Sequence, residues 1–424
     1  MRALACLAQS RGPPVSRRVA TRAAPASTMA SLPARTFKPC IITQPTPRNE
    51  TLLSMCPSLS APYSLPLPLC NGHVETIFAA LFRRTPGVVY DRELVHMPDG
   101  GLVALDARAT PAGEDPLPPT APVLLLLPGL TGGSEDSYVQ HQVHGAAAAG
   151  FRPLVMNMRG TSHMPVTTPR FFSAEDTGDI RRIVAHIRNL YPQSMLLAAG
   201  WSNGGNILTR YLGEEGDATP ITAAAVLCNP FNMPMCHENM SSGFSLLYNW
   251  NLGKSLRRIY LRHAPLFEAA AAAGEVAYKT DQAASASTIS AFDDAITTVT
   301  YGYASVDDYY AAASSDRDVG AVCVPTLFVQ AEDDPIAVQG AIPREGLLGN
   351  PNAILALTPT GGHLGWCGGK DGIFGAPWSN SVVLEWFSAI QKVAPLDFGK
   401  DQGGALPEDT TYSIASETIR KVVA

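Results

Sequence analysis

The sequence predicts an α/β protein with a mainly parallel central sheet, helices flanking that sheet, and an inserted helical cap. Six short apolar runs alternate with longer polar or amphipathic stretches from Val88 onward. Such runs are typical of strands that are buried on both faces of a parallel sheet. The alternation lapses for about 90 residues after Pro230. Because this stretch is helical in character and lies between two predicted strands, we predict a cap over residues 231–320.

Length and composition are compatible with one large α/β domain. The chain has 424 residues, of which 46% are hydrophobic and only 16% are charged. Length alone suggests two or three domains, but α/β folds often run longer as one domain. We predict an N-terminal arm over residues 50–84, the α/β domain over residues 85–395, and a polar tail over residues 396–424. The net charge of −6 argues against a general nucleic-acid-binding protein.

The first 49 residues differ from the rest in charge. They contain eight Lys or Arg and no Asp or Glu, which leaves 23 basic and 37 acidic residues, a net charge of −14, in the remainder. A basic, Ser- and Ala-rich leader suits an organellar transit peptide. We therefore predict either import into a chloroplast or mitochondrion or a disordered leader on a cytoplasmic protein. No run of 18 apolar residues predicts a transmembrane helix.

The order of elements follows from the apolar runs. The predicted strands cover residues 123–129, 152–160, 194–200, 223–230, 325–331 and 353–359. Helical patterns run from about Ala174 to Leu190, with Ser173 and Asp176 as a capping pair, and from about Gly205 to Glu214. Alternating strands and helices imply right-handed βαβ units. The chemistry of such sheets lies at the carboxyl ends of the strands.

A candidate nucleophile lies at one of these strand ends. The motif G-x-S-x-G occurs with Ser202 at its centre, directly after one predicted strand and before a predicted helix. This context is what a nucleophile elbow requires, since the serine there occupies a strained strand-to-helix turn. The alternative is a glycine-rich turn with a capping serine.

A serine nucleophile needs a base, and the base needs an orienting acid. Asp333, Asp334 and His363 follow later strands in the order Ser, Asp, His. Asp334 lies three residues after Ala331, the small residue that ends its strand, and is the favoured acid, whereas Asp333 stays open. His363 stands in a glycine-rich loop where its ring can reach the site with little steric hindrance.

The oxyanion of an acyl-transfer reaction needs two main-chain N–H donors. We predict Asn203, the residue after the nucleophile, and Leu130, in the loop after the strand 123–129. No phosphate-loop pattern and no HExxH are present, and His141 and His144 stand without a third ligand pattern. We therefore predict no cofactor and no metal. The eight Cys form no CxxC and are interpreted as mostly inert thiols of a reducing compartment.

Over residues 66–387 the chain resembles the α/β-hydrolase family 4 proteins. That family includes animal α/β-hydrolase-domain phospholipases, plant embryogenesis-associated hydrolases and yeast medium-chain ethyl-ester synthase/esterases. The segments that carry the resemblance are NGHVETIFAALFRR, MPDGGLVALD, LPGLTGGSEDSYV, GWSNGGNILTRYLGEEG, AEDDPI and GGHLGW. Departures include Glu75, where Gln is common in the family, and Asn203, where an apolar residue is usual. The resemblance implies a serine esterase or lipase with Ser202, Asp334 and His363 as its triad.

Three functions follow as hypotheses. The first is hydrolysis of a small-molecule acyl ester or lipid through an acyl-enzyme. The second is transfer of the same acyl group to an alcohol, and the third is a catalytically silent hydrolase fold used for binding. Met and aromatic residues of the cap are candidates for lining an acyl pocket. The apolar segment Asn71–Arg84 is either a peripheral membrane contact or a strut packed on the core.

Overall fold

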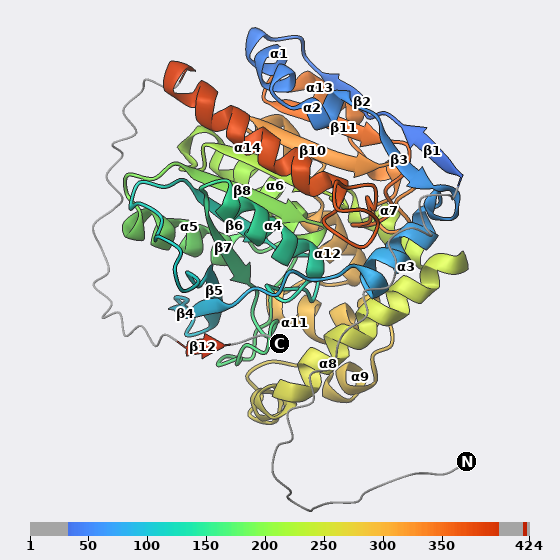
Figure 1. The fold of residues 1–424 in the computed structure, drawn as a ribbon. Coiled ribbons are helices and arrows are strands. Elements are labelled where there is room, and N and C mark those ends of the chain that lie inside the picture. Colours follow the sequence, from blue (N-terminus) through green and yellow to red (C-terminus); the bar gives the residue numbers. More distant parts are fainter. Residues whose placement is uncertain (1–32, 398–418, 422–424) are drawn as a thin grey trace, which may run out of the picture. The chain divides into compact units, whose positions relative to one another are not determined.

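The structure is a computed structural model that describes residues 33–397 and 419–421. It is the α/β fold that the sequence predicts, with helices on both faces of a mainly parallel sheet (Figure 1). Residues 1–32, which hold most of the predicted leader, and most of the predicted tail lie outside the described residues.

Within the described residues, the main sheet has ten strands. Their spatial order is β12 (Ile419–Lys421), β4 (Tyr90–His96), β5 (Leu102–Arg108), β7 (Arg152–Asn157), β6 (Val123–Leu127), β8 (Leu196–Trp201), β9 (Ala223–Leu227), β10 (Thr326–Ala331), β11 (Ala353–Thr358) and β2 (Cys40–Thr43). The strands from β7 to β11 pair in parallel, and those outside them pair antiparallel. All six predicted strands are confirmed, each slightly shorter than predicted. A second sheet pairs β1 (Ala34–Phe37) with β3 (Tyr63–Pro66).

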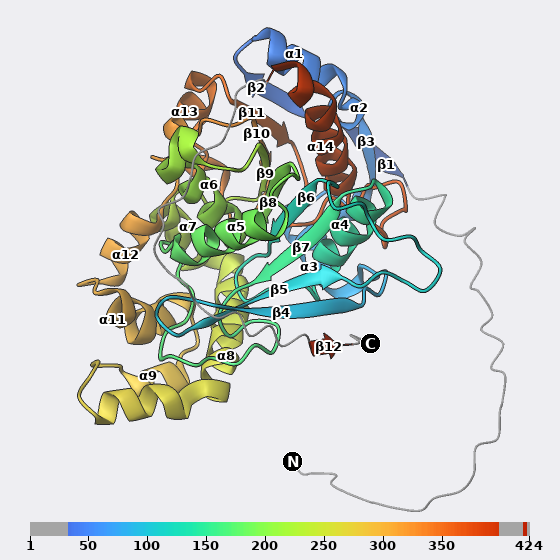
Figure 2. The same cartoon turned by 90° about the vertical axis from the view of Figure 1, so that its left-hand side faces the viewer.

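Two helical layers cover the sheet, as Figures 1 and 2 show. One face carries α4 (Ser137–Ala148) and α14 (Trp378–Asp397), and the other carries α5 (Gly178–Leu190) and α6 (Asn203–Glu215). Alternate residues of β6 serve the two cores, since Leu124 and Leu126 belong to the first and Leu125 to the second. Each such leucine contributes about 1.5–3 kcal/mol relative to an exposed one. The two-sided burial therefore explains why the strands read as continuous apolar runs.

Two predicted helix boundaries are wrong. Helix α5 begins at Gly178 rather than near Ala174. Ser173 lies ahead of the helix and accepts the N–H of Glu175, whereas Asp176 accepts the N–H of Gly178, the first residue of α5. The N-cap residue is Thr177, so the two do not form the predicted capping pair. Helix α6 begins at Asn203, two residues before the predicted Gly205. Only Ser202 separates the end of β8 at Trp201 from the start of α6, so the helix follows the strand directly.

The predicted boundary of the leader at residue 49 is also wrong. Strand β2 pairs antiparallel with β11 and completes one edge of the main sheet, and α1 (Pro47–Ser54) crosses the predicted boundary. The four-residue strand is hidden in the sequence, because the composition of the whole segment is dominated by its basic residues and prolines. The arm continues with α2 (Pro57–Ser60) and α3 (Gly72–Phe82). At the other end, α14 runs to Asp397, past the predicted boundary at 395.

The stretch between β9 and β10 forms a helical cap, as predicted. Its helices are α7 (Met233–Met240), α8 (Leu246–Ala272), α9 (Thr280–Ser285), α10 (Ile289–Phe292), a π-helical turn (Asp293–Thr297), α11 (Thr298–Tyr301) and α12 (Val306–Ala313). Helix α13 (Arg344–Gly349) follows β10. None of the helices in the described part of the chain combines the length and apolar character needed to cross a membrane.

Candidate active site

Ser202 occupies a sharp turn between β8 and α6. Its backbone angles are φ 52° and ψ −121°, outside the regions that residues with a Cβ ordinarily adopt. The turn is tight because two glycines allow close backbone approach. A Cβ on Gly204 would lie 2.2 Å from the Leu127 carbonyl oxygen, and one on Gly200 would lie 2.5 Å from the Gly204 carbonyl oxygen. The G-x-S-x-G motif therefore has the local geometry of a nucleophile elbow.

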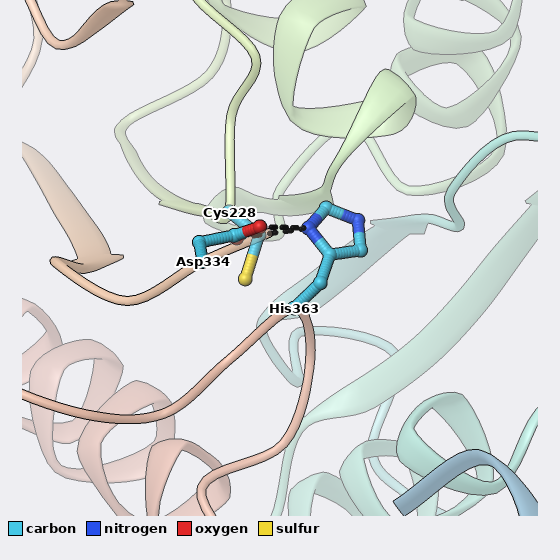
Figure 3. A group of neighbouring side chains, drawn as sticks. All are labelled: Cys228, Asp334 and His363. Atoms are coloured by element: carbon cyan, nitrogen blue, oxygen red, sulfur yellow. Dashed lines mark hydrogen bonds and ion pairs between the residues drawn. The ribbon is translucent and has the colours of Figure 1, made fainter. Parts of the chain in front are cut away.

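Ser202, His363 and Asp334 form one hydrogen-bonded chain. Ser202 Oγ lies 2.9 Å from His363 Nε2, and His363 Nδ1 lies 2.8 Å from Asp334 Oδ2 (Figure 3 shows the Asp334–His363 pair). Asp334 Oδ1 also accepts the main-chain N–H groups of Ile336 and Ala337, at 2.8 Å each. A carboxylate held by N–H donors favours the proton on Nδ1, which leaves the Nε2 lone pair free to take a proton from the serine.

Asp333, the alternative acid, makes different contacts from those of Asp334. Its carboxylate accepts the Thr360 hydroxyl at 2.6 Å and the Gly362 N–H at 2.9 Å. Both donors belong to the loop that carries His363. Asp333 therefore braces the histidine loop, whereas Asp334 contacts the ring itself.

Helix α3 holds the same loop from the other side. The Thr76 hydroxyl accepts the main-chain N–H of His363 at 2.8 Å and donates to the Gly72 carbonyl at 2.6 Å. A Cβ on Gly362 would lie 2.4 Å from the same Gly72 carbonyl oxygen. The arm thus contributes directly to the position of the histidine, a role for Thr76 that we did not predict. One side of the segment Asn71–Arg84 therefore packs on the core.

Glu75 is a second unpredicted participant of α3. It is fully buried, and its carboxylate accepts the main-chain N–H of Cys367 at 2.7 Å and the Thr360 hydroxyl at 3.3 Å. Burial, reinforced by the nearby Asp333 carboxylate, raises the pKa of Glu75 to about 8, although the Cys367 N–H and the Arg83 guanidinium act in the opposite direction. A lone acid on an otherwise apolar helix was the available sequence signal.

The two predicted oxyanion donors lie beside the serine. Leu130, Asn203 and Ser202 line one cavity. Asn203 is the first residue of α6, so its N–H has no acceptor within the helix. The loop that carries Leu130 passes close to the nucleophile, because a Cβ on Gly129 would lie 3.3 Å from Ser202 Cβ. The structure therefore brings all five predicted site residues together.

A buried polar network anchors the loop that contains Leu130. Asp106 accepts two hydrogen bonds from the Arg92 guanidinium, at 2.6 and 2.7 Å, one from Ser134 Oγ at 2.5 Å and one from Asn157 Nδ2 at 2.8 Å. The Ser134 N–H in turn donates to Asn157 Oδ1. This network connects β4, β5 and β7 to the loop, and its only sequence signal was an aspartate within an apolar strand.

Two cavities meet at Ser202. The first lies beneath the cap, is mainly apolar, and has a volume of about 100 Å³. We call it the enclosed cavity because it is the less open of the two. The second is an open groove of about 710 Å³ that is lined by residues of α3 and α8. Met233, Met240 and Phe292 of the cap line the enclosed cavity. Met235 and Trp250, from the same Met- and aromatic-rich stretch, are exposed instead.

The wall of the enclosed cavity contains one buried acid. Asp293 belongs to the π-helical turn and accepts the Thr297 hydroxyl at 2.7 Å and the Tyr310 hydroxyl at 2.9 Å. Burial raises the pKa of Asp293 to about 6 against the effect of these two donors. We did not predict this residue, and no motif surrounds it.

Cys228, Asp334 and His363 place a thiol, a carboxylate and a ring nitrogen within 4.8 Å of one another (Figure 3). Metal ligation requires a thiolate. Burial raises the pKa of the Cys228 thiol well above its usual value, and its sulfur accepts the Leu364 N–H. The Asp334 oxygens already accept N–H groups. The donor set therefore fits an orienting acid and its base, not a metal centre.

Comparison with known proteins agrees with this geometry. The family model described as "alpha/beta hydrolase fold" matches residues 122–365. The chain is 42% identical over 352 residues to "Embryogenesis-associated protein EMB8" of Picea glauca, covering 81% of this chain and 76% of that protein. It is 33% identical to "Phospholipase ABHD3" of Homo sapiens, covering 78% and 80%, and 31% identical to "Monoacylglycerol lipase" of Saccharomyces cerevisiae, covering 72% and 76%. The chain therefore belongs to the alpha/beta hydrolase family, in the group that contains these relatives.

Proposed function

We propose that this protein is a serine hydrolase of carboxylic esters, a lipase or esterase, which works through a Ser202–His363–Asp334 triad. The observation that carries the proposal is the continuous hydrogen-bonded chain from Asp334 to Ser202, located where an enclosed apolar cavity meets an open groove. The names of relatives as lipases, phospholipases and esterases support the same activity.

The proposed reaction has two half-reactions. His363 Nε2 takes the Ser202 proton while Oγ attacks the ester carbonyl, and Asp334 stabilises the imidazolium. The N–H groups of Leu130 and Asn203 stabilise the oxyanion. The imidazolium then gives its proton to the departing alcohol, which leaves an acyl group on Oγ. In the second half, His363 takes a proton from water as the water oxygen attacks the acyl carbonyl. The bond between the acyl carbon and Oγ then breaks, His363 returns the proton to Oγ, and the carboxylic acid leaves.

The two cavities suggest how the substrate is divided. We assign the acyl chain to the enclosed apolar cavity beneath the cap and the alcohol portion to the open groove. The small size of the enclosed cavity favours short to medium acyl chains. The larger and more polar groove suits a glycerol or phospholipid head group.

Active-site labelling tests the proposal. A fluorophosphonate probe should label the wild-type protein and fail to label Ser202→Ala, whose kcat should fall by several orders of magnitude. Ser60→Ala is the matched control, because Ser60 is exposed and its hydroxyl contacts only the Pro57 carbonyl. Wild-type protein that is neither labelled nor active on a medium-chain ester would instead favour a catalytically silent binding protein. Full activity of Ser202→Ala would refute Ser202 as the nucleophile.

Acyl transfer to an alcohol is the second candidate. The open groove reaches the acyl-enzyme and can admit an acceptor alcohol in place of water. A relative named "Medium-chain fatty acid ethyl ester synthase/esterase 2" of Saccharomyces cerevisiae, 27% identical, supports this chemistry. Product analysis with added ethanol separates the two reactions, because transfer yields the ethyl ester at the expense of the free acid.

We further propose that the basic leader directs import into a chloroplast or mitochondrion. Its charge carries this part of the proposal, since residues 1–33 contain five Arg and no acid. Because residues 34–49 belong to the fold, the targeting segment should end near residue 33. A fluorescent fusion of residues 1–33 that stays diffuse in the cytosol would contradict it.

A further inference from the structure

The two helices that line the catalytic groove carry exposed apolar side chains. Large exposed apolar side chains gathered on neighbouring elements mark an interaction surface, whereas single ones are ordinary. Six of those on the two helices that line the groove are Val74, Leu81 and Phe82 of α3 and Leu246, Leu247 and Trp250 of α8. Leu81 is 69% exposed and Phe82 is 54% exposed. We call these six residues the rim surface.

The two helices are joined, so the rim surface is a single feature. His73 Nδ1 lies 3.1 Å from the Tyr248 hydroxyl, and their rings stack with centroids 5.8 Å apart. Ile77 packs with Tyr248 and Met240 in a shared apolar cluster. Figure 1 shows α3 and α8 side by side. The apolar side chains of both therefore keep a fixed relation to the groove between them.

Basic residues continue the rim surface along α8. Lys254 and Arg258 are exposed, and Lys254 Nζ lies 4.4 Å from the centroid of the Trp250 ring. Within α3 and α8 the acidic residues are Glu75, which is buried, and Glu268, near the far end of α8. The chain as a whole has a net charge of −6. A basic face on an acidic protein thus lies beside the apolar rim.

We propose that the rim surface docks on an anionic lipid surface and presents the groove mouth to the lipid. Exposed Trp, Phe and Leu side chains enter the interfacial region of a bilayer, and adjacent Lys and Arg are attracted to anionic head groups. A lipid ester then reaches Ser202 along the groove without its acyl chain crossing open water. This inference rests on the proposed lipid-ester activity, but docking itself is measurable without catalysis.

Vesicle flotation with the full chain carrying Ser202→Ala tests docking. Vesicles of phosphatidylcholine with one third phosphatidylglycerol should bind the protein, and added salt or pure phosphatidylcholine should weaken binding. Phe82→Ser with Leu246→Ser, and separately Lys254→Glu with Arg258→Glu, should each reduce the bound fraction at least about tenfold. The controls are Leu348→Ser on α13, which is 47% exposed, and Lys392→Glu on α14, which is also exposed.

The controls also separate the rim surface from the basic leader, since every variant keeps that leader. Equal vesicle binding by the rim variants and the controls would overturn the proposal, as would absence of binding to anionic vesicles. The four substituted rim and basic residues line neither cavity. With Ser202 retained, the substitutions at these four positions should therefore leave hydrolysis of a soluble short-chain ester unchanged. They should lower hydrolysis of an ester that is carried in vesicles. Failure of the esterase assay in wild type would refute the proposed function and leave the flotation result independent of it.

Discussion

The main-chain N–H of His363 donates to the Thr76 hydroxyl at 2.8 Å, across 287 positions of sequence. Thr76 belongs to the N-terminal arm, and His363 belongs to the loop after β11. Helix α3, which we predicted to lie outside the α/β domain, therefore helps to fix the position of the His363 ring relative to Ser202. The arm is part of the site even though none of its side chains lies in the Ser–His–Asp chain.

Thr76→Val should lower kcat about tenfold to a hundredfold and leave KM nearly unchanged. Valine keeps the shape of threonine and removes the acceptor, so the histidine loop is free to shift, and small displacements of catalytic groups are costly. Steady-state kinetics on a soluble ester measure the split. Thr76→Ser restores the acceptor and should recover most of the activity. Equal losses in both variants would indicate a packing role instead.

Substitution of the two adjacent aspartates should lower kcat by very different amounts. Asp334→Asn leaves a side chain that favours the wrong histidine tautomer, and kcat should fall by about 10⁴. Asp333→Asn should cost kcat less than about tenfold, because Asp333 contacts Thr360 and Gly362 and not the ring. Its main effect should be a lower melting temperature. Kinetics and thermal unfolding of both variants decide the matter, and a reversed order of the kcat losses would assign the orienting role to Asp333.

The enclosed cavity should set the acyl chain length. Met240→Trp places a larger side chain in a cavity of about 100 Å³, so kcat/KM for an octanoyl ester should fall at least about tenfold relative to an acetyl ester, since each buried methylene contributes about 0.8 kcal/mol. Met235→Trp is the matched control on the same helix, because Met235 is 42% exposed and does not line the cavity. An unchanged octanoyl-to-acetyl ratio in Met240→Trp would place the acyl chain elsewhere.

Local motifs explain which parts of the site could be predicted. Ser202, Asp334 and His363 each follow a strand in a segment whose residues directly determine the local backbone. Gly200 is required by the Gly204 carbonyl of its own turn, and Gly204 is required by the backbone at the end of the neighbouring strand β6. The apolar runs likewise predicted six of the strands and their order along the chain. Such signals survive in one sequence because each depends on a few neighbouring residues.

Long-range partners could not be predicted in this way. Glu75 and Thr76 contact a loop nearly 290 positions away, and Asp106 joins strands to the loop after β6. Nothing near these residues in sequence specifies their partners. The edge strand β2 was not predicted for a related reason, because its four residues gain their strand conformation from pairing with β11. The missed features thus share a dependence on tertiary contacts.

Glu75 should make the stability of the protein depend on pH. Its pKa is about 8 in the folded protein against an ordinary value of 4.5. The folded state therefore holds a proton that the unfolded state has lost between these values, and the free energy of unfolding falls as pH rises through that window. Between pH 6 and pH 8 the loss should be about 2 kcal/mol, since one pH unit corresponds to about 1.4 kcal/mol.

Glu75→Gln removes this titration and retains a carbonyl oxygen that can accept the Cys367 N–H. Urea unfolding at pH 6 and pH 8 should show a smaller decrease in Glu75→Gln than in the wild type. The Asp333 carboxylate and the Arg83 guanidinium also face Glu75, but both remain in the variant. Burial raises the pKa of Asp293 to about 6, and its contribution is common to both proteins. Identical pH dependence in the two proteins would show that Glu75 does not carry the proton.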